Sequence, residues 1–336
     1  MPTLYPSPPV SARRFSAAAL LLCALLAGCG GDDSSSGDQQ PPPSAKAKDF
    51  PKPNGQSIAE LLNQVGGTGP VLAPSGLELR TGNHRVGFAL FSRSREQITD
   101  ASVALYAAPA GGGPAKGPYL ARSESLEVRP QFQSRQTATD PDSAKSIYTV
   151  EIPFEAPGRY ELLGVARIGG KLVPATTPSP GVVVKKESPD AIPAVGARPP
   201  RIHTPTVADV GGDVASIDTR LPPSSMHNAD FADVIGKKPV VLLFATPQLC
   251  QSRVCGPVVD VAEQVKASSG DDVEFIHMEI FRNNRIDEGV RPQMAAFHLQ
   301  TEPWLFVFDR SGKVSTRIEG AFSERELEQA ISKVKG

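Results

Sequence analysis

The sequence predicts an all-β domain followed by an α/β domain. Two observations carry this division. Between about residues 71 and 186, short runs rich in β-branched and aromatic residues are separated by Gly, Pro and Asp turns, with no long amphipathic helix between them. After residue 207, continuous apolar runs alternate with segments whose apolar residues recur at helical spacing. At 336 residues, the chain has room for about two domains.

Composition and charge exclude some classes of partner. The formal net charge is −1 and the pI is about 6.5, which gives no basis for nucleic-acid binding. The 33 prolines and 30 glycines are many for a compact enzyme, and they indicate linkers and turn-rich β structure.

The N-terminus carries the features of an exported protein. Arg13 and Arg14 precede an apolar run, 15-FSAAALLLCALLAG-28, that is too short to span a bilayer as a mature helix. Its end, 26-LAGC-29, resembles the lipobox of bacterial lipoproteins. The resemblance implies that residues 1–28 are a signal peptide and that the Cys29 sulfur carries diacylglycerol. The lipid would anchor the protein to the extracytoplasmic side of a bacterial membrane, in the cell envelope. The alternative is an ordinary signal peptide with an incidental cysteine.

Polar segments separate the predicted folded parts. Residues 29–55 contain almost no apolar side chains and are expected to form a disordered tether. A second segment, 187–206, has prolines at short intervals and is expected to be an extended, semi-rigid linker.

Residues 56–186 are predicted to form a β-sandwich, which begins with a short helix at 57–65. Ser57 and Glu60 have the spacing of a capping box for this helix. The candidate strands are 84–92, 102–108, 119–128, 146–154, 158–167, 171–176 and 181–185.

The β-rich part resembles an immunoglobulin-like domain at one point. The segment 156-APGRYELLGV-165 is similar to the approach to the tyrosine corner, which assigns that role to Tyr160. His84 stands alone, and Asp140 and Asp142 are interpreted as solvated loop charges. We therefore expect a binding or spacer module here.

Residues 207–336 are predicted to form the α/β domain. The run 239–245 is continuously apolar, as in a strand buried on both faces. The apolar residues of 256–267 recur at helical spacing. Ser323 and Glu326 form a capping box for a closing helix. The other expected elements are strands at 273–281, 304–309 and 313–320 and helices around 291–299 and at 323–335.

The cysteine count indicates a redox pair. Cleavage would remove Cys23 and lipidation would consume Cys29, so that Cys250 and Cys255 remain. Two thiols close in sequence outside the cytoplasm favour a disulfide-forming pair. A cysteine at a helix N-terminus faces free N–H groups and the positive end of the helix dipole, which favour the thiolate. Arg253, between the two cysteines, is a candidate to lower the thiol pKa further.

The order of elements around this pair resembles the thioredoxin superfamily, as a variant with four residues between the cysteines. The strand 240-VVLLFA-245 leads into Cys255-Gly-Pro, 301-TEPW-304 takes the place of the cis-proline loop, and 309-DRSGKV-314 matches the hairpin after it. The resemblance implies a thiol-disulfide oxidoreductase without cofactor or resident metal. Cys250 would attack, Cys255 would resolve, and Pro303 would be the cis-proline.

The same resemblance implies the partners. They would be thiols or disulfides of envelope proteins, or a membrane electron donor. Because the β-rich part is expected to be a spacer, deleting residues 71–186 is expected to leave thiol chemistry on a soluble substrate intact.

Three positions depart from the family's pattern. Gln248 and Leu249 replace the tryptophan that is usual before the first cysteine. No carboxylate lies in 240–245 to take a proton from a buried thiol. Glu302 precedes the expected cis-proline, where a small or β-branched residue is usual, and its charge would oppose thiolate formation.

One alternative is a thiol peroxidase. Thr246-Pro247 before Cys250, with a second cysteine five residues on, resembles peroxiredoxins of the Q type. The arginine that such a site needs would come from Arg282, Arg285 or Arg291, although 282–291 is better interpreted as a solvated loop.

Two further alternatives use the same cysteines. With His277 or His298 they would suit copper, as in Sco-type assembly proteins, although an isolated histidine is more often structural than a ligand. The last alternative is a non-catalytic thioredoxin-fold binding module whose cysteines form a static disulfide.

Overall fold

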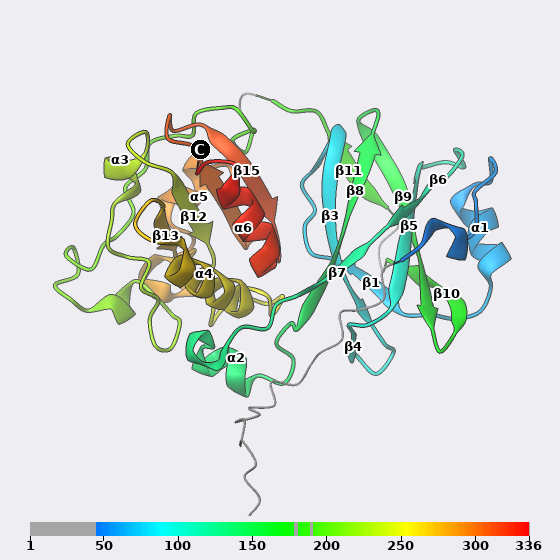
Figure 1. Cartoon of the computed structure of the whole chain (residues 1–336). Coiled ribbons are helices and arrows are strands. Elements are labelled where there is room, and N and C mark those ends of the chain that lie inside the picture. The colour runs from blue at the N-terminus through cyan, green and yellow to red at the C-terminus, as the bar shows by residue number, and fades with distance from the viewer. Residues whose placement is uncertain (1–44, 178–180, 189–190, 336) are drawn as a thin grey trace, which may run out of the picture. The chain divides into compact units, whose positions relative to one another are not determined.

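The computed structural model describes residues 45–177, 181–188 and 191–335 (Figure 1). The predicted signal peptide, Cys29 and the tether up to residue 44 lie outside these residues. All described residues belong to one compact unit. Among them, no helix has the length and apolar character needed to cross a membrane.

The N-terminal half is built on eleven strands joined in one branched sheet. The path runs β2-β11-β9-β10-β1-β3-β8-β7, with β4 paired to β3, β5 to β9 and β6 to β5. Alternate residues of β3 and β8 share one apolar core with residues of β5, β9 and β10, so two parts of the sheet pack face to face. The strands are β1 Val71–Pro74, β2 Leu79–Arg80, β3 Gly82–Phe91, β4 Gln97–Ile98, β5 Ser102–Pro109, β6 Lys116–Leu120, β7 Arg122–Ser125, β8 Ser146–Phe154, β9 Gly158–Ile168, β10 Lys171–Thr176 and β11 Val182–Lys185.

Tyr160 makes the backbone contact that a tyrosine corner requires. Its hydroxyl donates to the Ala156 carbonyl at 3.0 Å. The ring lies edge-on to Phe154, with 5.0 Å between the centroids. The contact fixes the turn before β9, while the immunoglobulin-like topology of the whole half stays a prediction.

Helix α1, Ile58–Val65, begins with the predicted capping box. The Glu60 N–H donates to Ser57 Oγ, and the Ser57 N–H donates to Glu60 Oε2 at 2.8 Å. The helix covers the outer face of β5 and β9. It therefore closes an apolar surface that the sheet alone would leave in water.

The predicted tether ends earlier than expected. Residues 45–55 contain a short 3-10 helix, η1 Ala47–Asp49, and the buried side chain of Phe50. The Tyr106 hydroxyl donates to the Pro51 carbonyl at 2.6 Å. One aromatic side chain and one hydrogen bond are enough to fix a segment whose composition otherwise predicts disorder.

The C-terminal half has a four-stranded sheet in the order β13-β12-β14-β15. Strand β12, Val240–Phe244, is parallel to β13, Glu274–Met278, and antiparallel to β14, Trp304–Phe308, which pairs with β15, Val314–Glu319. This arrangement confirms the α/β fold predicted for this half, with a mixed sheet. Short elements at its periphery are η3 Val214–Ser216, α3 Phe231–Val234, η4 Arg282–Asn284 and η5 Ile286–Glu288.

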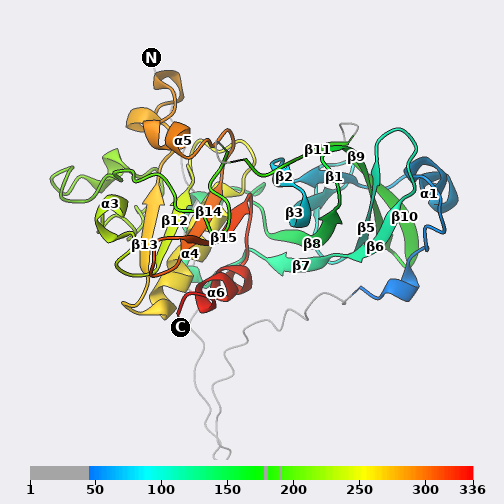
Figure 2. The ribbon, with the colours of Figure 1, turned by 90° about the horizontal axis from the view of Figure 1, so that it is seen from above.

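Helices cover both faces of this sheet (Figure 2). Val241 and Leu243 of β12 pack against α4, Cys255–Ser269, and α6, Glu324–Ser332. Val240, Leu242 and Phe244 face the side of α3 and of α5, Pro292–Ala296. Because alternate residues point to opposite faces, the fully apolar run of β12 is what a central strand needs. The predicted capping box of α6 is present at Ser323 and Glu326.

The segment expected to be a free linker packs against the α/β half. Within its described residues, Ile192 and Ile202 are buried in the same core as β14. The Gly196 N–H donates to the Val314 carbonyl at 2.7 Å, and the Val314 N–H donates to the Ala197 carbonyl at 2.9 Å. The prolines make this segment stiff, but its two isoleucines bind it to the fold.

The two halves share packing and are not independent. Leu126 and Ile147 of the β-rich half belong to the same apolar core as α4 and α6. The connection between β7 and β8 contains η2, Pro130–Phe132, and α2, Arg135–Thr139, and both contact α4. Removing residues 71–186 would therefore expose a buried face of α4, which argues against the prediction that thiol chemistry on a soluble substrate survives the deletion.

Replacing Leu126 with Ala is expected to destabilise both halves together. The residue is 2 % exposed, and truncating a buried Leu costs about 2–5 kcal/mol. Trp304, the one tryptophan of the chain, lies in the α/β half, so its fluorescence during urea unfolding reports on that half. Leu77→Ala, at a residue 58 % exposed, is the matched control. A Trp304 transition that Leu126→Ala leaves unmoved would contradict the shared core.

Candidate functional site

Cys250 and Cys255 form a disulfide where β12 leads into α4. Cys255 is the first residue of the helix, and Cys250 lies in the preceding loop, with 6.0 Å between the Cα atoms. Cys255 is fully buried, whereas Cys250 is 9 % exposed. Of the two cysteines, Cys250 is therefore the more exposed.

The redox loop, residues 245–254, is held from the β-rich half. Arg253 has a left-handed backbone, with φ of 60°, and its guanidinium pairs with the Asp140 carboxylate. Its carbonyl accepts a hydrogen bond from the Ala144 N–H at 3.2 Å. Arg253 was a candidate to favour the thiolate, but Asp140 compensates its charge. A different donor, the Ser252 hydroxyl, lies 3.2 Å from the Cys250 sulfur.

Glu302 and Pro303 lie on the other side of the disulfide. The peptide bond between them is cis, at the position predicted for the cis-proline. Glu302 Oε2 accepts a hydrogen bond from the Thr246 N–H at 2.7 Å and lies 3.5 Å from the Cys255 sulfur. A carboxyl group is thus within reach of the buried cysteine, although none lies in β12.

The surroundings of Glu302 adjust its acidity to the neutral range. Burial raises the pKa of this carboxyl to about 7, and the nearby Glu279 acts in the same direction, while the Thr246 N–H opposes them. The sequence-based expectation was that a charged Glu302 would oppose the thiolate. With this pKa, the group can instead accept or return a proton near neutral pH.

Thr246 is part of the support and does not face a bound peroxide. It is fully buried, and its Oγ1 accepts a hydrogen bond from the Ile280 N–H at 3.1 Å. Of the arginines considered for a peroxidase, Arg282 and Arg285 are exposed, and Arg285 pairs with Asp287. Arg291 is half-buried, and its guanidinium donates to the Phe281 carbonyl and the Asn284 side chain. These contacts give the peroxidase alternative no support.

A second layer of buried polar groups holds the redox loop. Glu279 Oε1 accepts hydrogen bonds from the Thr219 N–H and hydroxyl at 2.7 and 2.8 Å. Thr219 Oγ1 in turn accepts one from the Gln248 N–H at 3.2 Å. Burial raises the pKa of Glu279. The loop is thereby connected to the segment 217–227, which the sequence did not mark as functional.

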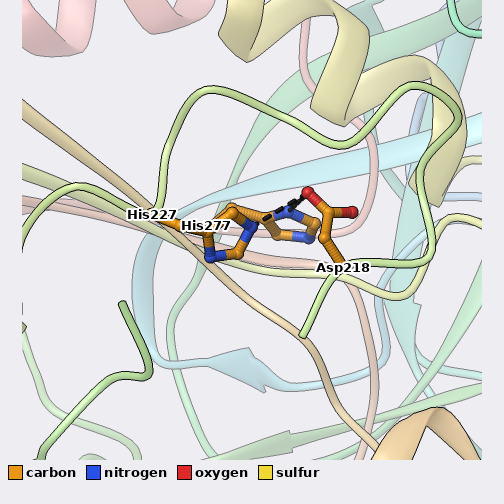
Figure 3. Close-up of side chains that lie close together, drawn as sticks. All are labelled: Asp218, His227 and His277. Atoms are coloured by element: carbon orange, nitrogen blue, oxygen red, sulfur yellow. Dashed lines mark hydrogen bonds and ion pairs between the residues drawn. The ribbon is translucent and has the colours of Figure 1, made fainter. Parts of the chain in front are cut away.

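Asp218, His227 and His277 form a buried cluster behind the end of β12 (Figure 3). His277 Nε2 donates to the Ala245 carbonyl at 2.9 Å, and its Nδ1 lies 3.3 Å from Asp218 Oδ2. His227 Nε2 lies 2.9 Å from the same oxygen. Backbone N–H groups of Arg220 and Ser224 also donate to this carboxylate.

This geometry favours a charged imidazole at position 277. A carbonyl can only accept, so His277 Nε2 carries a proton. Nδ1 lies 3.2 Å from the Ser224 hydroxyl and 3.3 Å from Asp218 Oδ2, and the buried carboxylate favours a second proton on this nitrogen. Burial opposes this charge, but Asp218 outweighs it and raises the pKa of His277 to about 9. Burial would likewise raise the pKa of Asp218, yet the His277 charge and the hydrogen bonds hold it well below its usual range.

Two sets of possible metal ligands occur among the described residues. In the first, Asp218, His227 and His277, the facing nitrogens are bonded to the carboxylate, and His227 Nδ1 is buried without a partner. A metal-bound histidine usually donates its second N–H, so this set fits an ion-pair network better. In the second, Cys250, Cys255 and Glu302, the two sulfurs are joined to each other.

Neither histidine considered for the copper alternative is placed to act as a ligand beside the cysteines. Both ring nitrogens of His277 are engaged, and His298 is exposed on the surface. The interpretation of His277 as structural is therefore preferred.

Sequence reasoning missed most of the buried polar residues. Asp218, Thr219 and Arg220 lie in a segment without periodicity, and Asp260 stands at a helix position that resembles a solvated one. No local signal distinguishes a carboxylate that will be buried and paired from one that faces water. Glu302 was detectable, because it occupies a position where a carboxylate is unusual.

Comparisons with known proteins found likeness in fold only. No family model and no curated protein matches the chain. A putative thiol:disulfide interchange protein DsbE from Chlorobium tepidum is similar at 16% identity and a TM-score of 0.31, over 43% of this chain and 99% of that one. A thioredoxin-family thiol:disulfide interchange protein from Chlorobium tepidum TLS is similar at 18% identity and a TM-score of 0.30, over 43% and 99%. A thioredoxin-like superfamily protein is similar at 20% identity and a TM-score of 0.27, over 33% and 88%. At these values the likeness carries no functional information, which has to come from the site itself.

His277→Asn is expected to lower stability and to change its dependence on pH. It leaves the Asp218 carboxylate buried without its charge partner, at a cost of about 3–5 kcal/mol. Because the pKa of His277 is raised to about 9, its contribution in the wild type is complete below about pH 6.5 and is lost as the pH rises through about 9. Urea unfolding between pH 6 and 9.5 should show this loss, of about 3 kcal/mol, only in the wild type.

His298→Asn is the control for this experiment. His298 is exposed and has a left-handed backbone, with φ of 57°, which Asn tolerates. It should behave as the wild type. Equal pH dependence in His277→Asn and the wild type would show that His277 is not the charged group.

Proposed function

We propose that the protein is a thiol-disulfide oxidoreductase that acts on protein partners through the Cys250–Cys255 pair. The observation that carries the proposal is the meeting of three groups at one point: the disulfide at the start of α4, the cis-Pro303 loop, and the Glu302 carboxyl 3.5 Å from the Cys255 sulfur. A static disulfide would need no such carboxyl. A sulfur that must gain and lose a proton while buried does need one.

In the reduced protein, the Cys250 thiolate attacks one sulfur of a partner disulfide. A mixed disulfide forms, and the partner's other sulfur leaves as a thiolate. Cys255 then gives its proton to Glu302 and attacks the Cys250 sulfur, which releases the partner's second thiolate. The partner gains two electrons, and Cys250 and Cys255 lose two as they form their disulfide. The reverse sequence oxidises a partner dithiol.

Two features favour Cys250 as the attacking residue. Its sulfur is the more accessible of the two, and the Ser252 hydroxyl can donate to its thiolate. The α4 N-terminus has no side-chain cap, and the N–H groups of Cys255 and Gly256 in its first turn can stabilise negative charge on the sulfurs.

The location and partners form part of the same proposal. The lipobox-like 26-LAGC-29 supports a lipid anchor at Cys29 on the extracytoplasmic side of the membrane. A disulfide is stable in that compartment. The partners would then be the thiols or disulfides of envelope proteins, or a membrane electron donor that restores the reduced pair.

Serine substitutions should separate the roles of the two cysteines. Cys255→Ser is expected to accumulate a mixed disulfide between Cys250 and a protein substrate, because the resolving thiol is absent. Cys250→Ser should form none, and both variants should lose insulin-reduction activity. Mass spectrometry of the non-reduced adduct checks the site. Adducts on Cys255 alone would reverse the assignment, and full activity in both variants would exclude the oxidoreductase.

Glu302→Gln should remove the pH dependence of the resolving step, in which Cys255 attacks the Cys250 sulfur. Because burial raises the pKa of Glu302 to about 7, its basic form appears as the pH rises through neutrality. The rate of the resolving step in the wild type should rise over this range, and the variant should lose the rise and be slower by about 10²-fold above pH 7. Rapid-mixing kinetics of the mixed disulfide from pH 5.5 to 8.5 provide the measurement.

Glu328→Gln, an exposed change of the same chemistry on α6, is the control for Glu302→Gln. It should keep the wild-type profile. If Glu302→Gln kept that profile as well, another group would have to take the Cys255 proton.

A further inference from the structure

A groove runs beside the disulfide, with a volume of about 720 Å³. One wall is the redox loop, from Pro247 to Arg253, and includes Cys250. The other wall comes from the β-rich half: α2 and the turn after it contribute Thr137, Thr139 and Asp140. The site is thus bounded by residues more than a hundred positions apart in the sequence.

The second wall is fixed in place and is not a mobile lid. Ser134, at the start of α2, donates from its N–H and hydroxyl to the buried Asp260 of α4 at 2.9 and 3.1 Å. Thr137 packs so closely on α4 that a Cβ added at Gly256 would lie 3.0 Å from its hydroxyl. The glycine of the Cys-Gly-Pro sequence therefore makes room for this wall.

Two groove-lining residues, Thr139 and Pro141, take no part in holding the wall in place. The wall is attached through Ser134, Gln136 and Thr137, whereas Thr139 and Pro141 are exposed. The Thr139 hydroxyl donates to the Arg135 and Gln136 carbonyls of its own helix. A segment that served merely to pack the two halves together would not need to present these residues beside Cys250.

The shape and charge of the groove define what can enter it. Cys250 is only 9 % exposed, which disfavours contact with the convex surface of a folded partner. The volume lies in the range of about 300–1,000 Å³ that holds small ligands or a few residues of chain. Asp140 and Arg253 neutralise each other, and the other lining residues are uncharged, half of them with amides or hydroxyls. These features favour an extended, polar, uncharged segment of polypeptide.

We propose that α2 and the turn to Ser143 are the specificity element of the redox site, and that the groove takes an extended, uncharged polar peptide segment carrying the reacting cysteine. The proposal rests on the proposed oxidoreductase function and adds the substrate class and the residues that select it. Thr139 is at the position where a larger side chain would fill the groove.

The test compares Thr139→Trp with Gln133→Trp in the full chain. Gln133 is exposed just before α2 and does not line the groove. Two substrates are used: a peptide rich in Ser, Thr and Gln whose central cysteine carries a disulfide-linked fluorophore, and 2-hydroxyethyl disulfide. For Thr139→Trp, the ratio of kcat/KM for the peptide to that for the small disulfide should fall about ten-fold. Gln133→Trp should keep the wild-type ratio.

Additional measurements distinguish a wrong substrate class, a wrong role for α2 and a wrong proposed function. Peptides with Lys or with Glu beside the cysteine should react more slowly than the uncharged peptide; faster reaction of either would overturn the proposed substrate class. An unchanged ratio in Thr139→Trp, with exchange otherwise active, would overturn the role of α2. Absence of exchange with both substrates in the wild type would instead remove the proposed function itself. Circular dichroism of each variant confirms that it is folded.

Discussion

The architecture depends on one buried charge, the Asp260 carboxylate of α4. It is fully inaccessible, and burial raises its pKa, while the Ser134 N–H and the Arg220 guanidinium act against that rise. Arg220 pairs with it at 2.9 Å and also donates to the Phe132 carbonyl. A charge in this position is tolerated only with a complete set of partners. Because the partners come from the β7–β8 connection and from the segment 217–227, satisfying Asp260 brings three distant segments together.

The segments that meet at Asp260 also support the redox site in two ways. The segment 217–227 supplies Thr219 and Asp218, which hold Glu279 and His277 near the strand ends that carry the loop. The β7–β8 connection supplies Asp140 and the Ala144 N–H, which hold the loop itself. Buried polar networks of this kind are costly unless their groups are paired, and here they hold the redox loop without filling the groove beside Cys250.

The sequence was most informative where structure is determined locally. The apolar run of β12, the helix that starts at Cys255, and the capping boxes at Ser57 and Ser323 depend on near neighbours, and all are present. The packing of the β-rich half on α4 could not be predicted, because it depends on pairs such as Ser134 with Asp260, 126 residues apart. The role of Glu302 was misjudged for a related reason: its effect on a thiol depends on its protonation, and burial, which the sequence does not show, sets the pKa.

The long spacing between the cysteines and the second wall are physically linked. With two intervening residues, both cysteines can belong to the start of one helix, whose hydrogen bonds fix them. With four, Cys250 must lie in a loop, and Arg253 takes a left-handed backbone that a non-glycine residue adopts only when its surroundings require it. The Asp140 ion pair and the hydrogen bond from the Ala144 N–H act on this residue. A longer loop therefore needs an outside support, and in this protein the support also forms one side of the groove through which a partner reaches the sulfur.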